Sequence, residues 1–191
     1  NEKKINQSPK LVVGIVVDQM KYQYLTKYWK HYSEGGFKRL INKGFNAKSN
    51  HYGYAQTSTG PGHTTVATGT HPGVHGIIGN SWFNKKTKKS VYCVDDMNYN
   101  TVGSSTDRGK KSPTNLLTTT LSDENRIATN FIGKTIGVAI KDRGSILSSG
   151  HTANAAYWFD SKEGSFISST YYLTSLPSWA QEFNDSRQID S

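Results

Sequence analysis

A threonine just ahead of a predicted helix is the strongest candidate for a reacting group in this sequence. Thr59 opens the run TGPGH at 59–63. Pro61 suits the first turn of a helix, because its φ angle is fixed and its missing N–H would have no partner there. The free N–H groups and the positive dipole of a helix start stabilise an alkoxide and attract a phosphate-like anion. Thr59 is therefore predicted to be a nucleophile, with a simple helix cap as the alternative.

Asp18 is the second candidate, because it ends a continuous apolar run. Residues 11–17 (LVVGIVV) predict a strand buried on both faces of a parallel sheet. In open α/β sheets, ligands bind outside the carboxyl ends of the strands, where Asp18 would stand. A carboxylate there could bind a metal ion or act as a base. The alternative is a helix cap or a partner for a nearby lysine.

Lys141 and Arg143 follow another apolar run, residues 135–140 (TIGVAI), which predicts a second strand. They would therefore also lie at the carboxyl end of a strand. Two cationic side chains there could hold an anionic group. The alternative is an ordinary basic pair in solvent, since most Lys and Arg residues are on the surface.

Several segments together resemble the alkaline phosphatase superfamily, and most closely its bacterial periplasmic phosphate monoesterases that use a threonine nucleophile. The similarity runs from Lys10 onward, and its segments follow one another in a specific order. They are VVDQM at 16–20, TGPGH at 59–63, HGIIGN at 75–80, KDRG at 141–144 and GHTANAA at 150–156.

The resemblance implies a role for five side chains. Asp18 would be a zinc ligand, and Thr59 would bind the metal ions as an alkoxide and become phosphorylated during the reaction. Asn80 would hydrogen-bond a phosphoryl oxygen, while Lys141 and Arg143 would hold the phosphoryl group and the leaving-group side. The implied activity is hydrolysis of phosphate monoesters by a two-zinc mechanism through a phospho-threonine.

Two other functions are weighed against this one. A phosphodiesterase of the same superfamily would keep Asp18, Thr59 and Asn80 but would be expected to lack the Lys141 and Arg143 pair. A diester carries one negative charge fewer and needs more room, so the pair favours monoesters. The alternative from another class is an anion-binding or interaction module without catalysis. Sulfatases are disfavoured, because their Cys/Ser-x-Pro-x-Arg pattern needs an arginine that TGPGH lacks.

The remaining zinc ligands implied by the resemblance are not found in the sequence. His71 and His75 are four residues apart, but Pro72 and Gly73 between them argue against a helix that presents both on one face. We interpret the histidines at 63, 71, 75 and 151 as structural or supporting residues. After Arg143, no Asp-x-x-x-His or Asp-His motif occurs. The chain is therefore expected to be the amino-terminal part of a longer enzyme, completed by a C-terminal segment of the same protein.

The composition and charge of the chain limit the kinds of binding partner that we expect. The 191 residues carry a net charge of +9 and a single cysteine, which cannot form an internal disulfide. No apolar run reaches the roughly 18 to 20 residues that cross a bilayer. The lysine cluster at 85–89 predicts the tip of a hairpin, and no nucleic-acid motif accompanies it. We expect small phosphate monoesters as substrates, with neither nucleic acid nor membrane as a partner.

The predicted fold class is α/β, with a largely parallel sheet, helices on both faces and an incomplete C-terminal side. Residues 1–9 are expected to be a polar tail left after processing, and the resemblance implies a periplasmic or secreted protein. Residues 10–191 would form the amino-terminal part of an alkaline phosphatase-like domain, with a loop-rich insertion at about 81–113. Predicted helices are 36–43, 61–68, 114–129 and 178–185; predicted strands are 11–17, 45–52, 135–140, 155–159 and 165–169.

Overall fold

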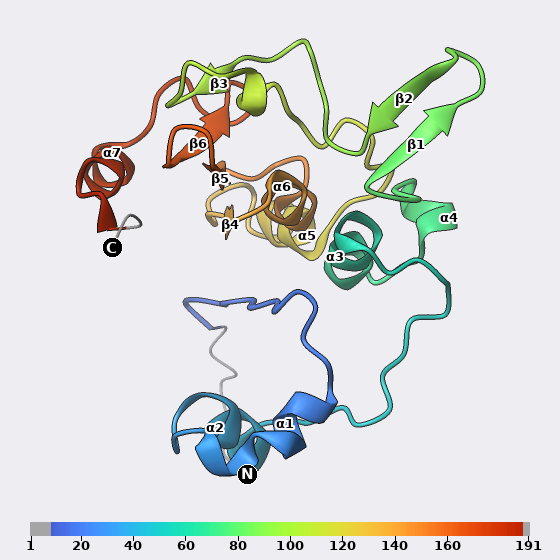
Figure 1. Ribbon diagram of the computed structural model, residues 1–191, viewed down its shortest axis with the longest axis vertical. Helices are drawn as coiled ribbons and strands as arrows, with labels where there is room; N and C mark the ends of the chain where they lie inside the picture. The colour runs from blue at the N-terminus through green and yellow to red at the C-terminus, as the bar shows by residue number, and fades with distance from the viewer. Residues whose placement is uncertain (1–8, 189–191) are drawn as a thin grey trace. The chain divides into compact units, whose positions relative to one another are not determined.

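The computed structural model describes residues 9–188 (Figure 1). Most of the predicted polar tail, residues 1–8, therefore lies outside the described residues. The chain divides into two compact units, Asn1–His51 and Tyr52–Ser191.

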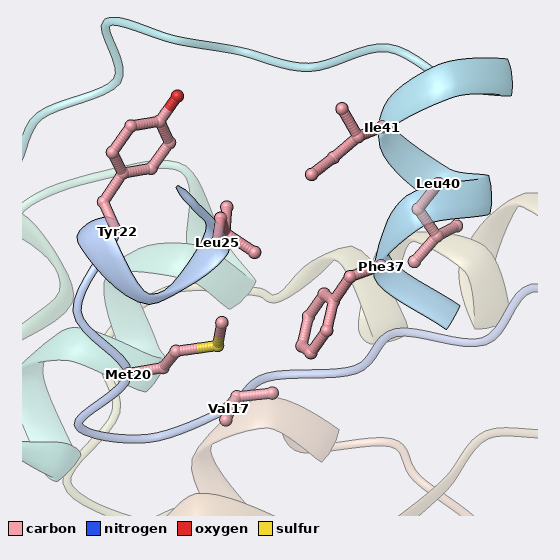
Figure 2. Close-up of a pocket in the computed structure, with 7 residues that line it drawn as sticks. All are labelled: Val17, Met20, Tyr22, Leu25, Phe37, Leu40 and Ile41. Atoms are coloured by element: carbon pink, nitrogen blue, oxygen red, sulfur yellow. The ribbon is translucent and has the colours of Figure 1, made fainter. Parts of the chain in front are cut away.

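The first unit holds short helices. They are α1 (Gln23–Lys27), the 3-10 helix η1 (Trp29–His31) and α2 (Gly36–Lys43). The bounds of α2 confirm the predicted helix at 36–43. An open apolar pocket lies beside α2, and Figure 2 shows the side chains that line it. They are Val17, Met20, Tyr22, Leu25, Phe37, Leu40 and Ile41.

The predicted strand at 11–17 is not formed in this structure. The segment has no assigned secondary structure, and Leu11 and Ile15 are each 78% exposed. A strand is stable only when a neighbour takes up its N–H and C=O groups, and no strand within residues 9–188 pairs with this segment. The predicted strand at 45–52 is absent for the same reason. Both predictions are wrong here, because apolar composition alone does not supply a pairing partner.

The second unit contains a mixed four-stranded sheet in the order β3-β6-β5-β4. Its strands are β3 (Thr101–Val102), β4 (Ile136–Ala139), β5 (Ala155–Asp160) and β6 (Ser165–Ser169). Only β4 and β5 pair in parallel among these strands; β5 with β6 and β3 with β6 are antiparallel. A tight turn joins β5 to β6, whereas helix α6 (Asp142–Ser149) connects β4 to β5, so the sheet is mixed rather than largely parallel.

Helices cover both faces of this sheet, as the sequence predicted. Ala156 and Trp158 of β5 join a core with Ile146 and Leu147 of α6. The alternate residues of β5 instead pack with Ala180 of α7 (Ser178–Asp185). Successive side chains of a strand point to opposite faces, so α6 and α7 lie on opposite sides of β5. This arrangement confirms the α/β fold class.

The remaining elements of the second unit surround the candidate residues. They are α3 (Thr59–Thr68), α4 (Pro72–His75), β1 (Ser81–Asn84), β2 (Lys89–Tyr92), η2 (Asp107–Gly109) and α5 (Leu121–Ala128). Strands β1 and β2 form the hairpin whose tip the lysine cluster predicted. Helices α3 and α6 pack side by side (Figure 1). The predicted helix at 114–129 is shorter than expected, because a capping box of Thr120 and Asp123 starts α5 at Leu121.

Among the residues that the structure describes, no helix is both long enough and apolar enough to cross a membrane.

Candidate active site

Thr59 is the first residue of helix α3. Ser58 is the N-cap, with extended backbone angles (φ −63°, ψ 167°), and its carbonyl oxygen accepts from the N–H of Gly62 at 2.8 Å. Pro61 lies in the first turn, as expected. Gly69 ends the helix in the left-handed region (φ 68°), where glycine is favoured. Thr59 therefore lies one residue inside the helix, among the N–H groups that have no intrahelical partner.

Asn80 is joined directly to the start of α3. The N–H of Gly60 donates to Asn80 Oδ1 at 2.7 Å. Because the acceptor of an N–H must be the oxygen, this contact fixes which end of the Asn80 carboxamide faces the helix and leaves the NH₂ group on the other side. A Cβ on Gly60 would lie 3.1 Å from Asn80 Oδ1 and 3.4 Å from Cys93 Sγ. Glycine thus allows the close approach of these segments.

Arg143 is held at the start of α6 by a tyrosine from the hairpin. Its Nη1 donates to the Tyr92 hydroxyl at 2.7 Å, and that hydroxyl donates to Asp142 Oδ1, also at 2.7 Å. Burial, together with the neighbouring Asp142 carboxylate, raises the pKa of Tyr92, so its hydroxyl is protonated at neutral pH. Burial alone would lower the pKa of Arg143, but the contacts with Tyr92 and Asp142 raise it. The guanidinium stays charged in a mostly buried position.

A lysine balances the acidic side of this cluster. Lys111 Nζ forms an ion pair with Asp95 and lies 3.9 Å from Asp142 Oδ2. The same ammonium group lies 4.9 Å from the centre of the Tyr92 ring. These contacts partly neutralise Asp142, so less of its charge opposes an anion near Arg143.

The base of the hairpin connects the asparagine to the arginine. The Asn80 carbonyl accepts from the N–H of Cys93 at 3.0 Å, and Tyr92 is the preceding residue. The structure therefore brings Thr59, Asn80 and Arg143 into one contiguous cluster through these contacts. Lys141 is the N-cap residue of α6 and is exposed.

Cys93 lies inside this cluster but is no candidate for catalysis. It is fully buried, and burial is the main cause that raises the pKa of its thiol to about 12. A thiol attacks as its thiolate, which this environment disfavours. Cys93 is a small apolar residue of the core.

Asp18 belongs to the first unit. One oxygen of its carboxylate accepts from the N–H of Gln19 at 3.1 Å. Gln19 has a φ of 59°, a left-handed backbone conformation that is uncommon for a residue other than glycine. The assignment of Asp18 as a zinc ligand stays a prediction.

Residues 9–188 do not by themselves fit a zinc site. They contain no group of three or more His, Cys, Asp or Glu side chains that could hold a metal ion. His75 is buried with both ring nitrogens engaged: Nδ1 accepts from the N–H of Ile77 at 3.1 Å, and Nε2 lies 3.2 Å from Thr65 Oγ1. Burial lowers the pKa of His75. This histidine is structural, in agreement with the sequence interpretation.

Sequence reasoning missed Tyr92 and Asp142. Tyr92 lies 51 residues before Arg143, and nothing in its local pattern indicates that contact. Asp142 stands between two predicted site residues, so its position alone could have drawn attention to it. The contacts of Tyr92 with Asp142 and Arg143 form only because the fold packs the hairpin against the start of α6.

The fold and the cluster define an α/β protein with a donor-rich site at the starts of two helices. Residues 12–191 match the type I phosphodiesterase / nucleotide pyrophosphatase family, and the chain belongs to that family. The resemblance to the alkaline phosphatase superfamily is thereby confirmed.

Three curated relatives illustrate the similarity. Alkaline phosphatase PhoV of Synechococcus elongatus is 54% identical and is matched over 94% of this chain and 32% of its own length. Alkaline phosphatase PafA of Elizabethkingia meningoseptica is 49% identical, over 93% and 33%. A calcium-transporting ATPase of Myroides odoratus is 48% identical, over 96% and 34%. The chain thus spans about a third of the length of these relatives.

Solved structures agree with the fold. The crystal structure of wild-type PafA matches with a TM-score of 0.93 at 48% identity, over 95% of this chain and 35% of that one. A PafA variant with one threonine, one asparagine, one lysine and one arginine substituted matches with a TM-score of 0.89 at 44% identity, over 91% and 34%.

Proposed function

We propose that the protein hydrolyses phosphate monoesters through a phospho-threonine formed on Thr59, in a two-zinc mechanism. The observation that carries the proposal is the joining of the Thr59 helix start to Asn80, through the 2.7 Å bond from Gly60. Arg143 adds a fixed cation to the same cluster. The names of the alkaline phosphatase relatives support this reaction class.

The chain's own residues would divide the work of phosphoryl transfer. The Thr59 oxygen forms a bond to phosphorus while the ester P–O bond breaks and the alcohol leaves; water then releases phosphate and restores Thr59. The Asn80 amide group donates to a phosphoryl oxygen. Lys141 and Arg143 offset the charge of the dianion, which is most of what such a transition state requires. The substituted PafA variant carries changes at these same four residue types.

Zinc, when bound, would favour the alkoxide of Thr59 and neutralise negative charge. Asp18 and Thr59 are the ligands that we propose from this chain. Since residues 9–188 lack a cluster that could hold a metal ion, the proposal needs further ligands from another segment of the same protein. The greater length of the relatives is consistent with such a segment.

Hydrolysis of p-nitrophenyl phosphate tests the proposal, with the protein that the complete gene encodes and with the 191-residue chain in parallel. Thr59→Ala should abolish turnover, whereas Thr59→Ser should retain part of it. Ser58→Ala is the matched control, because Ser58 makes no side-chain capping bond and its loss removes only a neighbouring hydroxyl. A chelator should remove the activity and added zinc should restore it. Unchanged turnover in Thr59→Ala would refute the nucleophile.

A phosphodiesterase is the second candidate, and the description of the matched family favours it. Turnover of bis-p-nitrophenyl phosphate separates the two. Arg143→Ala should reduce monoester turnover by about 10- to 100-fold, the value of a lost charged hydrogen bond, and diester turnover by much less. Equal losses would remove Arg143 from monoester discrimination. A non-catalytic anion-binding module would instead retain phosphate affinity and show no Thr59-dependent turnover.

We also propose that the protein is periplasmic or secreted, as the resemblance of its motifs to periplasmic phosphate monoesterases implies. Small phosphate monoesters, rather than nucleic acid or membranes, would be its partners. Osmotic-shock fractionation of the producing cell tests the location: release with periplasmic markers, or recovery from the medium, is expected. Retention with cytoplasmic markers would contradict the proposed location.

A further inference from the structure

The guanidinium of Arg143 is fixed on one side and lacks a partner on another. Nη1 donates to the Tyr92 hydroxyl at 2.7 Å. Nε, in contrast, is buried and has no hydrogen-bond acceptor within residues 9–188. Leaving a buried charged donor unpaired is costly. The Arg143 side chain is nevertheless 18% exposed, so another part of the guanidinium can be reached by an acceptor on a bound ligand.

The Tyr92 hydroxyl can only accept a hydrogen bond from Arg143, not donate one to it. It donates its single proton to Asp142 Oδ1 at 2.7 Å, so its lone pairs are what face Arg143 Nη1. Asp142 Oδ1 also accepts from the backbone N–H of Arg143 at 2.7 Å. Tyr92 is thus held by the start of α6 while it holds the side chain of the next residue on that helix.

The position of Tyr92 is itself well determined. It is the last residue of β2, where it pairs with Ser81 of β1. The following residue, Cys93, donates its N–H to the carbonyl of Asn80. The backbone that carries Tyr92 is therefore bonded to the asparagine proposed to contact the same phosphoryl group.

We propose that Tyr92 is a positioning residue, which holds the Arg143 guanidinium so that its exposed N–H groups, on the part not bonded to Tyr92, face a phosphoryl oxygen of the substrate. This inference rests on the proposed monoesterase function. The N–H groups of a planar guanidinium point in fixed directions, so the orientation of the group decides whether they meet the phosphoryl oxygens. A long side chain that is already held in place also loses less rotamer freedom when the ligand binds. Without the hydroxyl, Arg143 would keep its charge but not its orientation.

Tyr92→Phe in the complete, zinc-loaded enzyme tests the inference, because the substitution removes one oxygen. The kcat/KM for p-nitrophenyl phosphate should fall by about 10- to 100-fold, as for loss of a hydrogen bond to a charged group. Turnover of bis-p-nitrophenyl phosphate should change by less than about threefold, since this contact serves the monoester dianion. The inhibition constant of inorganic phosphate should rise in Tyr92→Phe.

The decisive measurement is the same substitution in an Arg143→Ala background. If Tyr92 acts through Arg143, Tyr92→Phe should then change kcat/KM by less than about twofold. A loss caused by poor folding would recur in that background, so the cycle separates positioning from stability. Full multiplication of the two losses, or a Tyr92→Phe enzyme with unchanged kcat/KM, would overturn the inference.

Tyr171→Phe is the matched control. The Tyr171 hydroxyl donates to the carbonyl of His151 at 2.9 Å, so this variant also loses one partly buried tyrosine bond. Its monoester-to-diester ratio should equal that of the unsubstituted enzyme. Thr59-dependent turnover of the unsubstituted enzyme, measured in the same preparation, shows separately whether the proposed function holds.

Discussion

Asn80 allows the structural and the chemical use of one side chain to be separated. Its oxygen accepts from the N–H of Gly60 at 2.7 Å, and Gly60 is buried. Its amide NH₂ group is the part proposed to meet the phosphoryl oxygen. Asn80→Asp keeps an oxygen for Gly60 but replaces the NH₂ donor with a second anionic oxygen. Asn80→Ala removes both.

The expected magnitudes follow from these contacts. In Asn80→Ala, the buried N–H of Gly60 loses its acceptor, which costs about 1–3 kcal/mol and should speed its amide exchange by about 5- to 150-fold. In Asn80→Asp, exchange at Gly60 should change by less than about threefold, because a carboxylate at a helix start is a good acceptor. Both variants should lose monoester kcat/KM, and Asn80→Asp should lose more, since its charge repels the dianion.

Hydrogen exchange of the peptide around Gly60 and hydrolysis of p-nitrophenyl phosphate, on the same complete protein, give the two readouts. Protected exchange in Asn80→Ala would mean that the oxygen of Asn80 is not what secures Gly60. Full activity in Asn80→Asp would mean that the amide donor has no part in the reaction. Either result would contradict the proposed link between the start of α3 and the phosphoryl group.

Two further predictions concern the scaffold. Gly137→Ala would place a Cβ against Ser149 Oγ and 3.0 Å from the carbonyl oxygen of Ser145, so it should lower the free energy of unfolding by about 1–3 kcal/mol. Gly53→Ala, where the Cβ meets no atom within 4 Å, should leave the melting temperature unchanged. Burial alone would raise the pKa of Asp123, but hydrogen bonds from Thr120 and Thr152 hold it below its ordinary value. A carboxylate whose pKa is lower in the folded state stabilises the fold at pH values above its unfolded pKa of about 3.9. That stabilisation is lost as the pH falls through the folded-state pKa. The difference in melting temperature between the unsubstituted protein and Asp123→Asn should therefore become smaller below about pH 4. A difference that does not change with pH would contradict the lowered pKa of Asp123.

Local sequence patterns correctly predicted the elements that are formed by residues close together in the sequence. The hairpin of β5 and β6 and the helices α2 and α7 lie where the sequence indicated. The start of α5 was within reach as well, because Thr120 and Asp123 have the spacing of a capping box. The predicted helix at 114–129 is too long because it extends past this cap.

Pairing partners could not be predicted in the same way. The run at 11–17 has the composition of a buried strand, yet its secondary structure depends on a neighbour that no local pattern names. Tyr92 shows the same limit at the candidate site. Its role depends on a contact across 51 residues. Thr59, in contrast, was predicted from the local signals of a helix start, and Lys141 from its place after an apolar, strand-like run.

The candidate site uses the starts of α3 and α6 together, and their packing sets its geometry. A Cβ on Gly144 would lie 3.7 Å from His63 Cδ2, an ordinary contact, so the two helices approach closely one turn in from their starts. At these starts the N–H groups of Gly60 and Arg143 already donate to Asn80 and Asp142. The side-chain donors left for a ligand are the NH₂ group of Asn80 and the guanidinium of Arg143, and the two helix dipoles add to the charge of Arg143. The acidic side chain nearest to Arg143, Asp142, accepts from Tyr92 and lies near Lys111. The cluster therefore offers a net excess of donors, which suits an incoming phosphate dianion.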